Sequence, residues 1–200
     1  MSEVKTNKVS PVGANGTVTL GDSGDTITIP AGATITNSGT ATGFGKVLQV
    51  VNAIKSDTNS TTSNSAVTTG LEASITPSAT SSKVLVLISF AYQADSDTNS
   101  IFQLYRDSTA IHLGDAGGSR ERASAGTVYQ MPGAAADVLS ASINCLDSPS
   151  STSSITYKLM FFAGRSAGSN PIYLNRGQTD TDNDSHKRAI SSITLMEIAG

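Results

Sequence analysis

The sequence predicts an all-β protein in two parts: a short N-terminal arm or β-stem over residues 1–45, and an antiparallel, jelly-roll-like β-sandwich over residues 46–200. Three observations lead to this fold class. Ser and Thr make up about a quarter of the 200 residues, and the branched Cβ of Thr suits a pleated strand. Apolar and polar residues alternate in short runs, which is the pattern of half-buried strands. Turn residues separate these runs at short spacing, which favours a sandwich or jelly roll.

About ten runs between residues 46 and 200 have the length and composition of strands. They are residues 46–55, 71–76, 83–92, 101–105, 110–113, 123–130, 138–146, 155–162, 171–175 and 189–198. The run 83–92 is continuously apolar, which predicts a central strand covered on both faces. The last run places Ile193 and Leu195 in one register, with Glu197 in the same register. We expect this strand to lie in the middle of a sheet or at a subunit contact. The polar stretch 56–65 is expected to be a loop.

The first 45 residues contain three short alternating segments, Thr17–Leu20, Thr26–Ile29 and Ala33–Thr36. Turn residues, among them Gly21-Asp22 and Pro30-Ala31-Gly32, bound them. Each segment offers only two or three apolar side chains, too few to bury a core alone. Two arrangements follow: rungs of a small solenoid, or strands wound around other copies of the chain. The alternative is an arm that becomes ordered only on docking.

Composition argues against several classes of protein. Charged residues are only 14% of the chain, and the net charge of -3 argues against nucleic acid as a partner, because such partners require a basic surface. No apolar run approaches 18 residues, so we expect no membrane insertion, and the N-terminus lacks the pattern of a signal peptide. The single Cys145 lies in an alternating apolar run and is expected to be a core residue.

Segments of both parts resemble a known group of proteins. The run GDSGDTITIPAGATITNSGTATGFG (residues 21–45) and the opening KTNKVSP (residues 5–11) are similar to segments of fibre-type virion proteins of marine and cyanobacterial bacteriophages. So are ITPSATSSKVLVLISF (75–90), LYRDSTAIHLGDAGGSR (104–120), SASINCLDSP (140–149) and ITLMEIAG (193–200). The resemblance implies a homotrimer with a β-rich stem and a globular head.

The resemblance also implies a non-enzymatic role in the virion, after assembly in the host cytoplasm. We expect a fibre or spike subunit whose N-terminal arm docks on other virion proteins and whose head binds a host cell-surface receptor. The short stem argues against a long tail fibre. The alternative is a capsid decoration or head-fibre protein that recognises no host.

An acidic stretch is the one candidate metal site. Asp180, Asp182 and Asp184 stand at alternate positions, as carboxylates do in calcium loops. The stretch lacks the glycine and the distant glutamate of an EF-hand, so a solvated turn is the simpler interpretation. Ca²⁺ or another hard cation is the alternative, and no other cofactor is expected.

A glycine-rich loop, residues 114–122, carries Arg120 and Arg122 on either side of Glu121. Arginine forks pair with carboxylates or phosphates, so this loop is a candidate recognition or intersubunit surface. The alternative is an intrachain salt bridge, such as one from Arg106 or Arg120 to Asp107 or Asp115.

Aromatic and catalytic residues give weaker signals. Tyr129 and Tyr173 are candidates for a sugar-binding surface, and core packing is the alternative. The two histidines, His112 and His186, are far apart, and no nucleophile motif accompanies either. The four glutamates are widely separated, unlike the paired carboxylates of a glycosidase. We therefore expect no catalytic residues and no enzyme activity.

Overall fold

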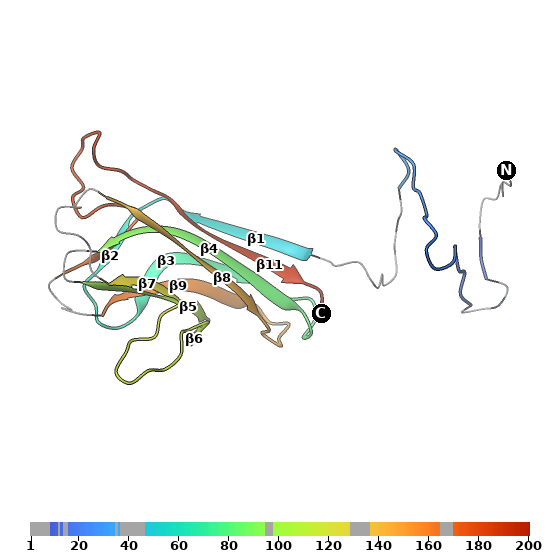
Figure 1. The fold of residues 1–200 in the computed structure, drawn as a ribbon, viewed down its shortest axis with the longest axis horizontal. Coiled ribbons are helices and arrows are strands. Elements are labelled where there is room, and N and C mark those ends of the chain that lie inside the picture. The colour runs from blue at the N-terminus through green and yellow to red at the C-terminus, as the bar shows by residue number, and fades with distance from the viewer. Residues whose placement is uncertain are drawn as a thin grey trace. The chain divides into compact units, whose positions relative to one another are not determined.

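The computed structural model describes residues 9–11, 13, 16–34, 36, 47–94, 98–128, 137–164 and 170–200. The chain divides into two compact units, Met1–Phe44 and Gly45–Gly200. The second unit is built entirely from strands and their connections (Figure 1). Among the described residues there is no helix with the length and apolar character that crossing a bilayer demands.

Eleven strands lie in the described part of the second unit. They are β1 (Val47–Lys55), β2 (Asn59–Thr61), β3 (Val67–Ile75), β4 (Lys83–Ala94), β5 (Asn99–Arg106), β6 (Thr109–Ile111), β7 (Ala125–Val128), β8 (Leu139–Asp147), β9 (Ile155–Ala163), β10 (Ile172–Leu174) and β11 (Ser191–Ile198). The long strands coincide with the longest alternating runs of the sequence, because alternation buries one face of each strand. The hairpin turn at Asp107-Ser108, between β5 and β6, is where the sequence predicts it.

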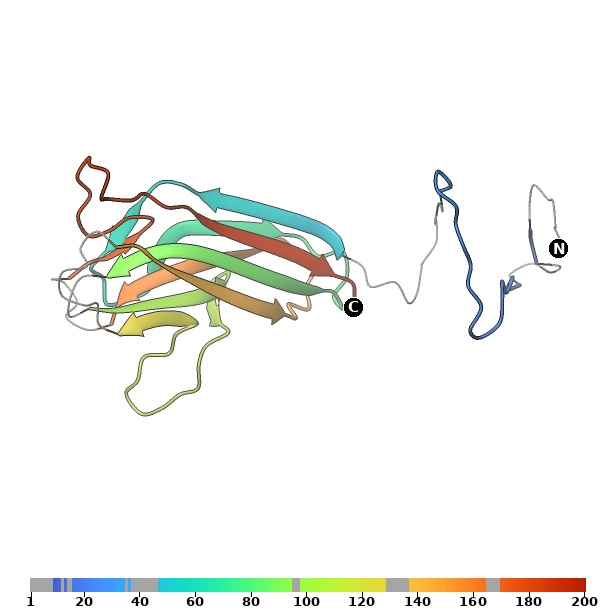
Figure 2. The same ribbon diagram turned by 45° about the horizontal axis from the view of Figure 1, so that its top comes forward.

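The strands form two antiparallel sheets that face each other, so the predicted β-sandwich is confirmed. Sheet A has the order β1-β11-β4-β10-β2, and β8 pairs with the other edge of β4. Sheet B has the order β3-β9-β5-β6, and β7 also pairs with β5. Figure 2 shows β1, β11, β4 and β8 side by side. The last strand, β11, lies between β1 and β4, which confirms its expected place in the middle of a sheet.

One hydrophobic core fills the space between the sheets. Phe102 of β5 lies at its centre, with its ring centroid 4.6 Å from that of Phe90 and 4.9 Å from that of Tyr92. Val84 and Val86 of β4 are fully buried on the inner side of sheet A, and Cys145 of β8 is also buried, which confirms its expected place in the core. The outward side chains of β4 differ, because Leu85 and Leu87 are only half-buried. The expectation that both faces of β4 are covered is therefore wrong for the single chain.

Two strand predictions need correction. The stretch 56–65 contains a strand, β2, because its backbone pairs with β10. The side chain of Asn59 also donates through Nδ2 to the carbonyls of Thr68 and Thr69 (3.2 and 3.1 Å). Strand β3 begins at Val67, four residues earlier than predicted. It passes through Gly70, which has a φ of 82° at a register shift against β9. Such a left-handed glycine at a bulge interrupts the alternation from which strands are predicted.

In the arm, residues 16–34 form no strand, so solenoid rungs are absent from this described stretch of the single chain, whereas strands wound around other copies and an arm ordered by docking stay predictions. The predicted turns are confirmed: the amide of Asp25 donates to Asp22 O (3.0 Å), and that of Ala33 donates to Pro30 O (3.1 Å). The segment Ala33–Thr36 lies partly outside the described residues. Residues 16–34 are exposed throughout, including their apolar side chains. A single copy provides no neighbouring strand for these segments, which is why only local turns form.

Candidate functional site

The loop between β6 and β7 is the site that sequence analysis and structure share. It projects from the sandwich (Figure 1). A hydrogen bond from Gly114 N to Ala123 O (3.1 Å) closes its base, and a turn from Arg120 N to Gly117 O (3.2 Å) shapes its tip. Gly118 in that turn has a φ of 62°, a conformation that glycine adopts without strain.

Arg122 and Arg120 have different roles in this loop. The Nε of Arg122 donates to Gly114 O (2.7 Å), and Gln103 on β5 donates to Arg122 O (2.6 Å). Arg122 therefore fixes the loop to sheet B. Arg120 is exposed and lines a pocket of about 610 Å³ together with its neighbours Ser119 and Glu121. Of the two arginines, Arg120 is the one placed to contact a ligand.

The floor of this pocket is formed by β5, β7 and the end of β9. Gly126 is required there, because a Cβ would lie 2.3 Å from Ser100 O. Gly164 is less constrained, since its Cβ would lie 2.4 Å from Cδ1 of Ile101, the end of a side chain that can shift. Asn99 also lines the pocket, and its Oδ1 is buried with no hydrogen-bond partner among the described residues. An unpaired buried amide oxygen favours a bound hydrogen-bond donor. The pocket thus combines a guanidinium, a carboxylate, a hydroxyl and an amide, a mixture that suits polar, uncharged groups.

The acidic stretch does not gather its carboxylates. Asp180 is held in a bidentate ion pair by Arg188, with its oxygens 2.8 Å from Nε and 2.6 Å from NH2. Asp182 and Asp184 are exposed. Across the described part of the chain, no group of three His, Cys, Asp or Glu side chains is placed to hold a metal ion. Calcium binding at this stretch stays a prediction without support from the geometry.

The tyrosine candidates do not join the pocket. Tyr129 lies outside the described residues. Tyr173 is buried in β10, and the guanidinium of Arg176 lies 4.2 Å from the centroid of its ring. Arg176 occupies one face of this ring, which argues for packing and against sugar binding there. His112 is exposed just after β6, and His186 contacts Thr181 Oγ1 through Nδ1 (3.0 Å).

Sequence reasoning missed an ion pair that joins the two sheets. Arg106 of β5 pairs through NH1 with both carboxylate oxygens of Asp147 on β8 (3.1 and 2.9 Å), and Tyr157 of β9 donates to Asp147 Oδ2 (2.6 Å). The suggested pairing of Arg106 with Asp107 is wrong, because Asp107 Oδ1 instead accepts from Thr156 N (2.9 Å). Burial and the bond to Asp147 raise the pKa of the Tyr157 hydroxyl. Burial, and then the nearby Asp147 charge, raise the pKa of the Cys145 thiol, which keeps it protonated.

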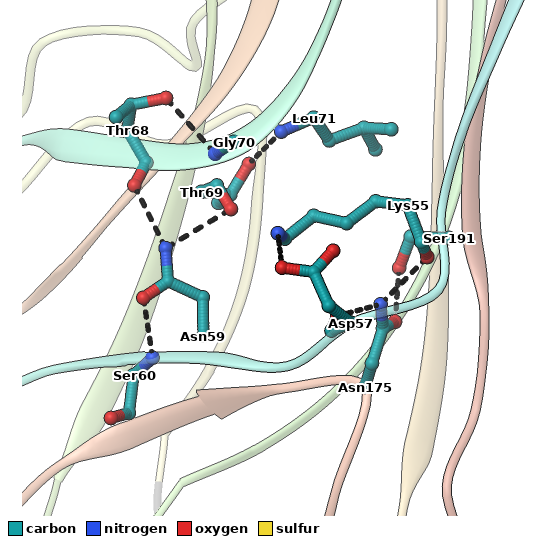
Figure 3. A network of polar contacts seen from close by, with 10 residues as sticks. All are labelled: Lys55, Asp57, Asn59, Ser60, Thr68, Thr69, Gly70, Leu71, Asn175 and Ser191. Carbon is teal, nitrogen blue, oxygen red and sulfur yellow. Dashed lines mark hydrogen bonds and ion pairs between the residues drawn. The ribbon is translucent and has the colours of Figure 1, made fainter.

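A second polar network lies at the β2 end of sheet A (Figure 3). The Nδ2 of Asn175 donates to the carbonyls of Lys55 (2.8 Å) and Asp57 (2.9 Å), and Ser191 donates to Asn175 Oδ1 (2.6 Å). Lys55 in turn pairs with Asp57 (2.7 Å). Asn175 has a φ of 61°, a backbone conformation that asparagine tolerates better than most residues. This network fixes the connection after β10 and is structural.

Glu197 is a third buried polar centre, near the end of β11. Its oxygens accept hydrogen bonds from Ser78 N (2.7 Å), Ser78 Oγ (2.6 Å) and Gln49 Nε2 (2.6 Å). Burial alone would raise its pKa, but these hydrogen bonds outweigh that effect and lower the pKa to about 2. Glu197 is therefore ionised at neutral pH and ties β11 to β1 and to the turn after β3.

The comparisons with known proteins add no identification. No protein-family model matches the chain, and no curated protein matches it significantly. The β6–β7 loop pocket around Arg120 is therefore the candidate site on geometry alone.

Proposed function

We propose that the chain is a non-enzymatic structural protein of a bacteriophage particle, a fibre or spike subunit that works as a homotrimer. In this proposal the N-terminal arm holds the subunit to other virion proteins, and the sandwich is the head that adheres to the host surface. The resemblance of residues 21–45, and of four segments of the head, to phage fibre-type proteins supports the phage assignment.

The observation that carries the proposal is the exposure of the arm. Val18, Leu20, Ile27 and Ile29 are 39–67% exposed, and the segments around them form no strand in one chain. The sandwich completes its own core, whereas the arm does not. Alternating segments with exposed apolar side chains are stabilised when other strands cover them, which identical arms in a trimer would supply. This is the behaviour required of a stem or of an anchor.

The β6–β7 loop pocket gives the head a surface for adhesion. Arg120, Glu121 and Asn99 present both hydrogen-bond donors and acceptors, as recognition of sugar hydroxyls requires. One such contact is weak, but three copies on one trimer multiply its effect by raising the local concentration. We therefore place the receptor contact at this loop.

Two measurements test the proposal. Light scattering of the full chain should give three times the monomer mass of 20.4 kDa; a monodisperse monomer would contradict the trimer. Antibody labelling of phage particles should then find the chain on a fibre or spike, and the free protein should compete with infection. Labelling confined to threefold positions on the capsid, without competition, would instead establish a decoration protein.

A control variant separates adhesion from assembly. Arg120→Ala removes the guanidinium from the pocket and leaves the loop closed, because Arg122 holds the base. We expect this variant to remain trimeric and to lose most of its competition with infection. Full competition by Arg120→Ala would exclude the loop as the receptor contact while leaving the virion role intact.

A further inference from the structure

The outer face of sheet A is a second unusual surface of the sandwich. It is formed by the outward side chains of four neighbouring strands, and three rows cross it in register. The first row is Val50, Met196, Leu85 and Leu146; the second is Asn52, Thr194, Leu87 and Asn144; the third is Ile54, Ser192, Ser89 and Ser142. Residues paired in this way share one face of a sheet.

The first of these rows is apolar, and the three rows together are uncharged. The first row consists of four hydrophobic side chains, and Val50 and Leu146 at its ends are each 56% exposed. None of the twelve side chains in the three rows carries a charge, and the nearest charge on this face is the exposed Lys83, which pairs with Ile198 beyond the first row. Exposed apolar surface arranged in one contiguous patch is typical of an interaction site, whereas isolated apolar residues are ordinary.

We propose that the outer face of sheet A is the surface through which copies of this chain bind one another. The inference deepens the proposed function, because it names the head's share of the trimer interface. It also explains β4, whose continuous apolar run has only its inner face covered within one chain.

The lack of charge in the three rows favours a second copy of the chain as the partner that binds the outer face of sheet A. In a threefold assembly of identical chains, a charged group near the shared axis meets the same charge on the other copies, and a charged group elsewhere in the interface must be desolvated. The three uncharged rows avoid both costs, and Lys83 at the end of the sheet can keep its ammonium in water. The second row adds amides and hydroxyls that bond to one another, as Asn52 Nδ2 already does to Thr194 Oγ1 (2.8 Å).

The connection of the arm favours the same occupant. The apolar row lies toward the end of the sheet where β1 begins and β11 finishes, since Val47 pairs with Ile198 there (Figure 1). Copies that meet on this face therefore bring the starting points of their arms together. Four strands and three rows cover about 19 Å by 20 Å, which is about half of the ~800 Å² per partner in a stable interface. The face needs a second contact, and arm-to-arm association would supply it.

Charge placed on the face tests the inference. The double variant Val50→Lys with Leu146→Lys adds two positive charges at positions already half-exposed, so the fold should tolerate it. The matched control, Ser74→Lys with Ser108→Lys, adds the same charge at exposed positions of sheet B and the β5–β6 turn. Sedimentation velocity of the full chains should show a trimer for the wild type and the control, and the 20.4 kDa monomer for the face variant.

Each outcome decides a different claim. A face variant that stays trimeric, with unchanged circular dichroism, would overturn the proposed interface and leave the trimer standing. A monomeric wild type would overturn both the trimer and the interface. A control that also dissociates would show that added charge, and not the location, breaks the assembly, and would overturn the interface as well.

Footprinting of the wild type gives a test that needs no variant. Met196 on the outer face of sheet A and Met160 on the outer face of sheet B are both half-buried in one chain. In the assembled protein, oxidation of Met196 by hydroxyl radicals should slow at least several-fold relative to Met160. Equal oxidation of the two methionines in a trimeric sample would overturn the proposed interface.

Discussion

The two outer faces of the sandwich have the same strand pattern and different chemistry. On sheet B, one row runs from Glu72 through Lys158 to Tyr105, so a carboxylate and an ammonium stand side by side on adjacent strands. On sheet A the corresponding central row is Val50, Met196, Leu85 and Leu146. Alternation therefore shows which side chains point outward, and their composition shows which outward face is suited to water. Sheet B has a solvent face, and sheet A has a face that lacks a partner in the single chain.

A single charge introduced at the centre of each outer face should give the largest difference in assembly between the two faces. Leu85→Lys places an ammonium in the middle of the apolar row, where assembly would bury it without a counter-ion. We expect the dissociation constant of the proposed trimer to rise by about 100-fold or more, equivalent to about 3 kcal/mol. Sedimentation over a dilution series measures this change. The matched variant Tyr105→Lys on sheet B should assemble like the wild type, and an equal loss in both variants would end the distinction between the faces.

The inner side of sheet A makes the fold sensitive to acid, because the carboxylate of Glu197 is buried there. The folded pKa of about 2 lies below the ordinary value of 4.5, so the ionised carboxylate stabilises the fold. That stabilisation is complete above about pH 4.5 and is lost as pH falls toward 2. Glu197→Gln should lower the free energy of unfolding by about 1–3 kcal/mol at pH 7, and its stability should vary less with pH across this range. Urea unfolding at pH 7 and pH 3 measures both effects.

Glu72→Gln is the control for this acid effect. Glu72 is exposed on sheet B, so the variant should keep the full acid sensitivity of the wild type. If Glu197→Gln unfolded in acid with the same pH dependence as the wild type, the hydrogen bonds from Ser78 and Gln49 would not be the source of the low pKa.

The part of the fold that the sequence predicts is the part in which apolar and polar residues alternate along a strand. Strands β4, β9 and β11 are long alternating or apolar runs, and their inner registers follow directly from the pattern, including the inward place of Glu197. Strand β2 is different, because it forms by pairing with β10, which is distant in the sequence, and none of its three polar residues is buried. Strand propensity depends only on the local sequence and does not include such a contact. The polar stretch 56–65 is therefore expected to be a loop.

The candidate sites depend on contacts between distant residues, and here sequence is weaker. Arg120 is identifiable because arginine and glycine concentrate in one loop, but the pocket also includes Asn99 of β5 and Gly164, the residue after β9. The ion pair of Arg106 and Asp147 joins residues 41 positions apart, whereas Asp107 is the nearest carboxylate in the sequence. The alternate spacing of the carboxylates in the acidic stretch does not predict that Arg188 forms an ion pair with Asp180.

The charged row of sheet B should contribute little to stability. Glu72 and Lys158 are cross-strand neighbours at the surface, where water and salt weaken their attraction. Glu72→Gln should change the free energy of unfolding by about 0.5 kcal/mol or less at pH 7, as measured by urea unfolding. A loss above about 2 kcal/mol would mean that this face is also covered in the assembly, because only a desolvated pair is worth that much.

A change in salt concentration should have the smallest effect on assembly. This experiment compares the two outer faces without any substitution. An interface formed by the uncharged rows of sheet A has no ion pairs to screen, so raising NaCl from about 0.05 M to about 1 M should leave the proposed trimer intact. Apolar burial is, if anything, strengthened by salts that are excluded from protein surfaces. Dissociation in high salt, followed by sedimentation, would point to the charged face of sheet B as the one that binds. Persistence of the trimer in high salt, together with its loss in Leu85→Lys, is the combination that only an apolar interface on sheet A produces.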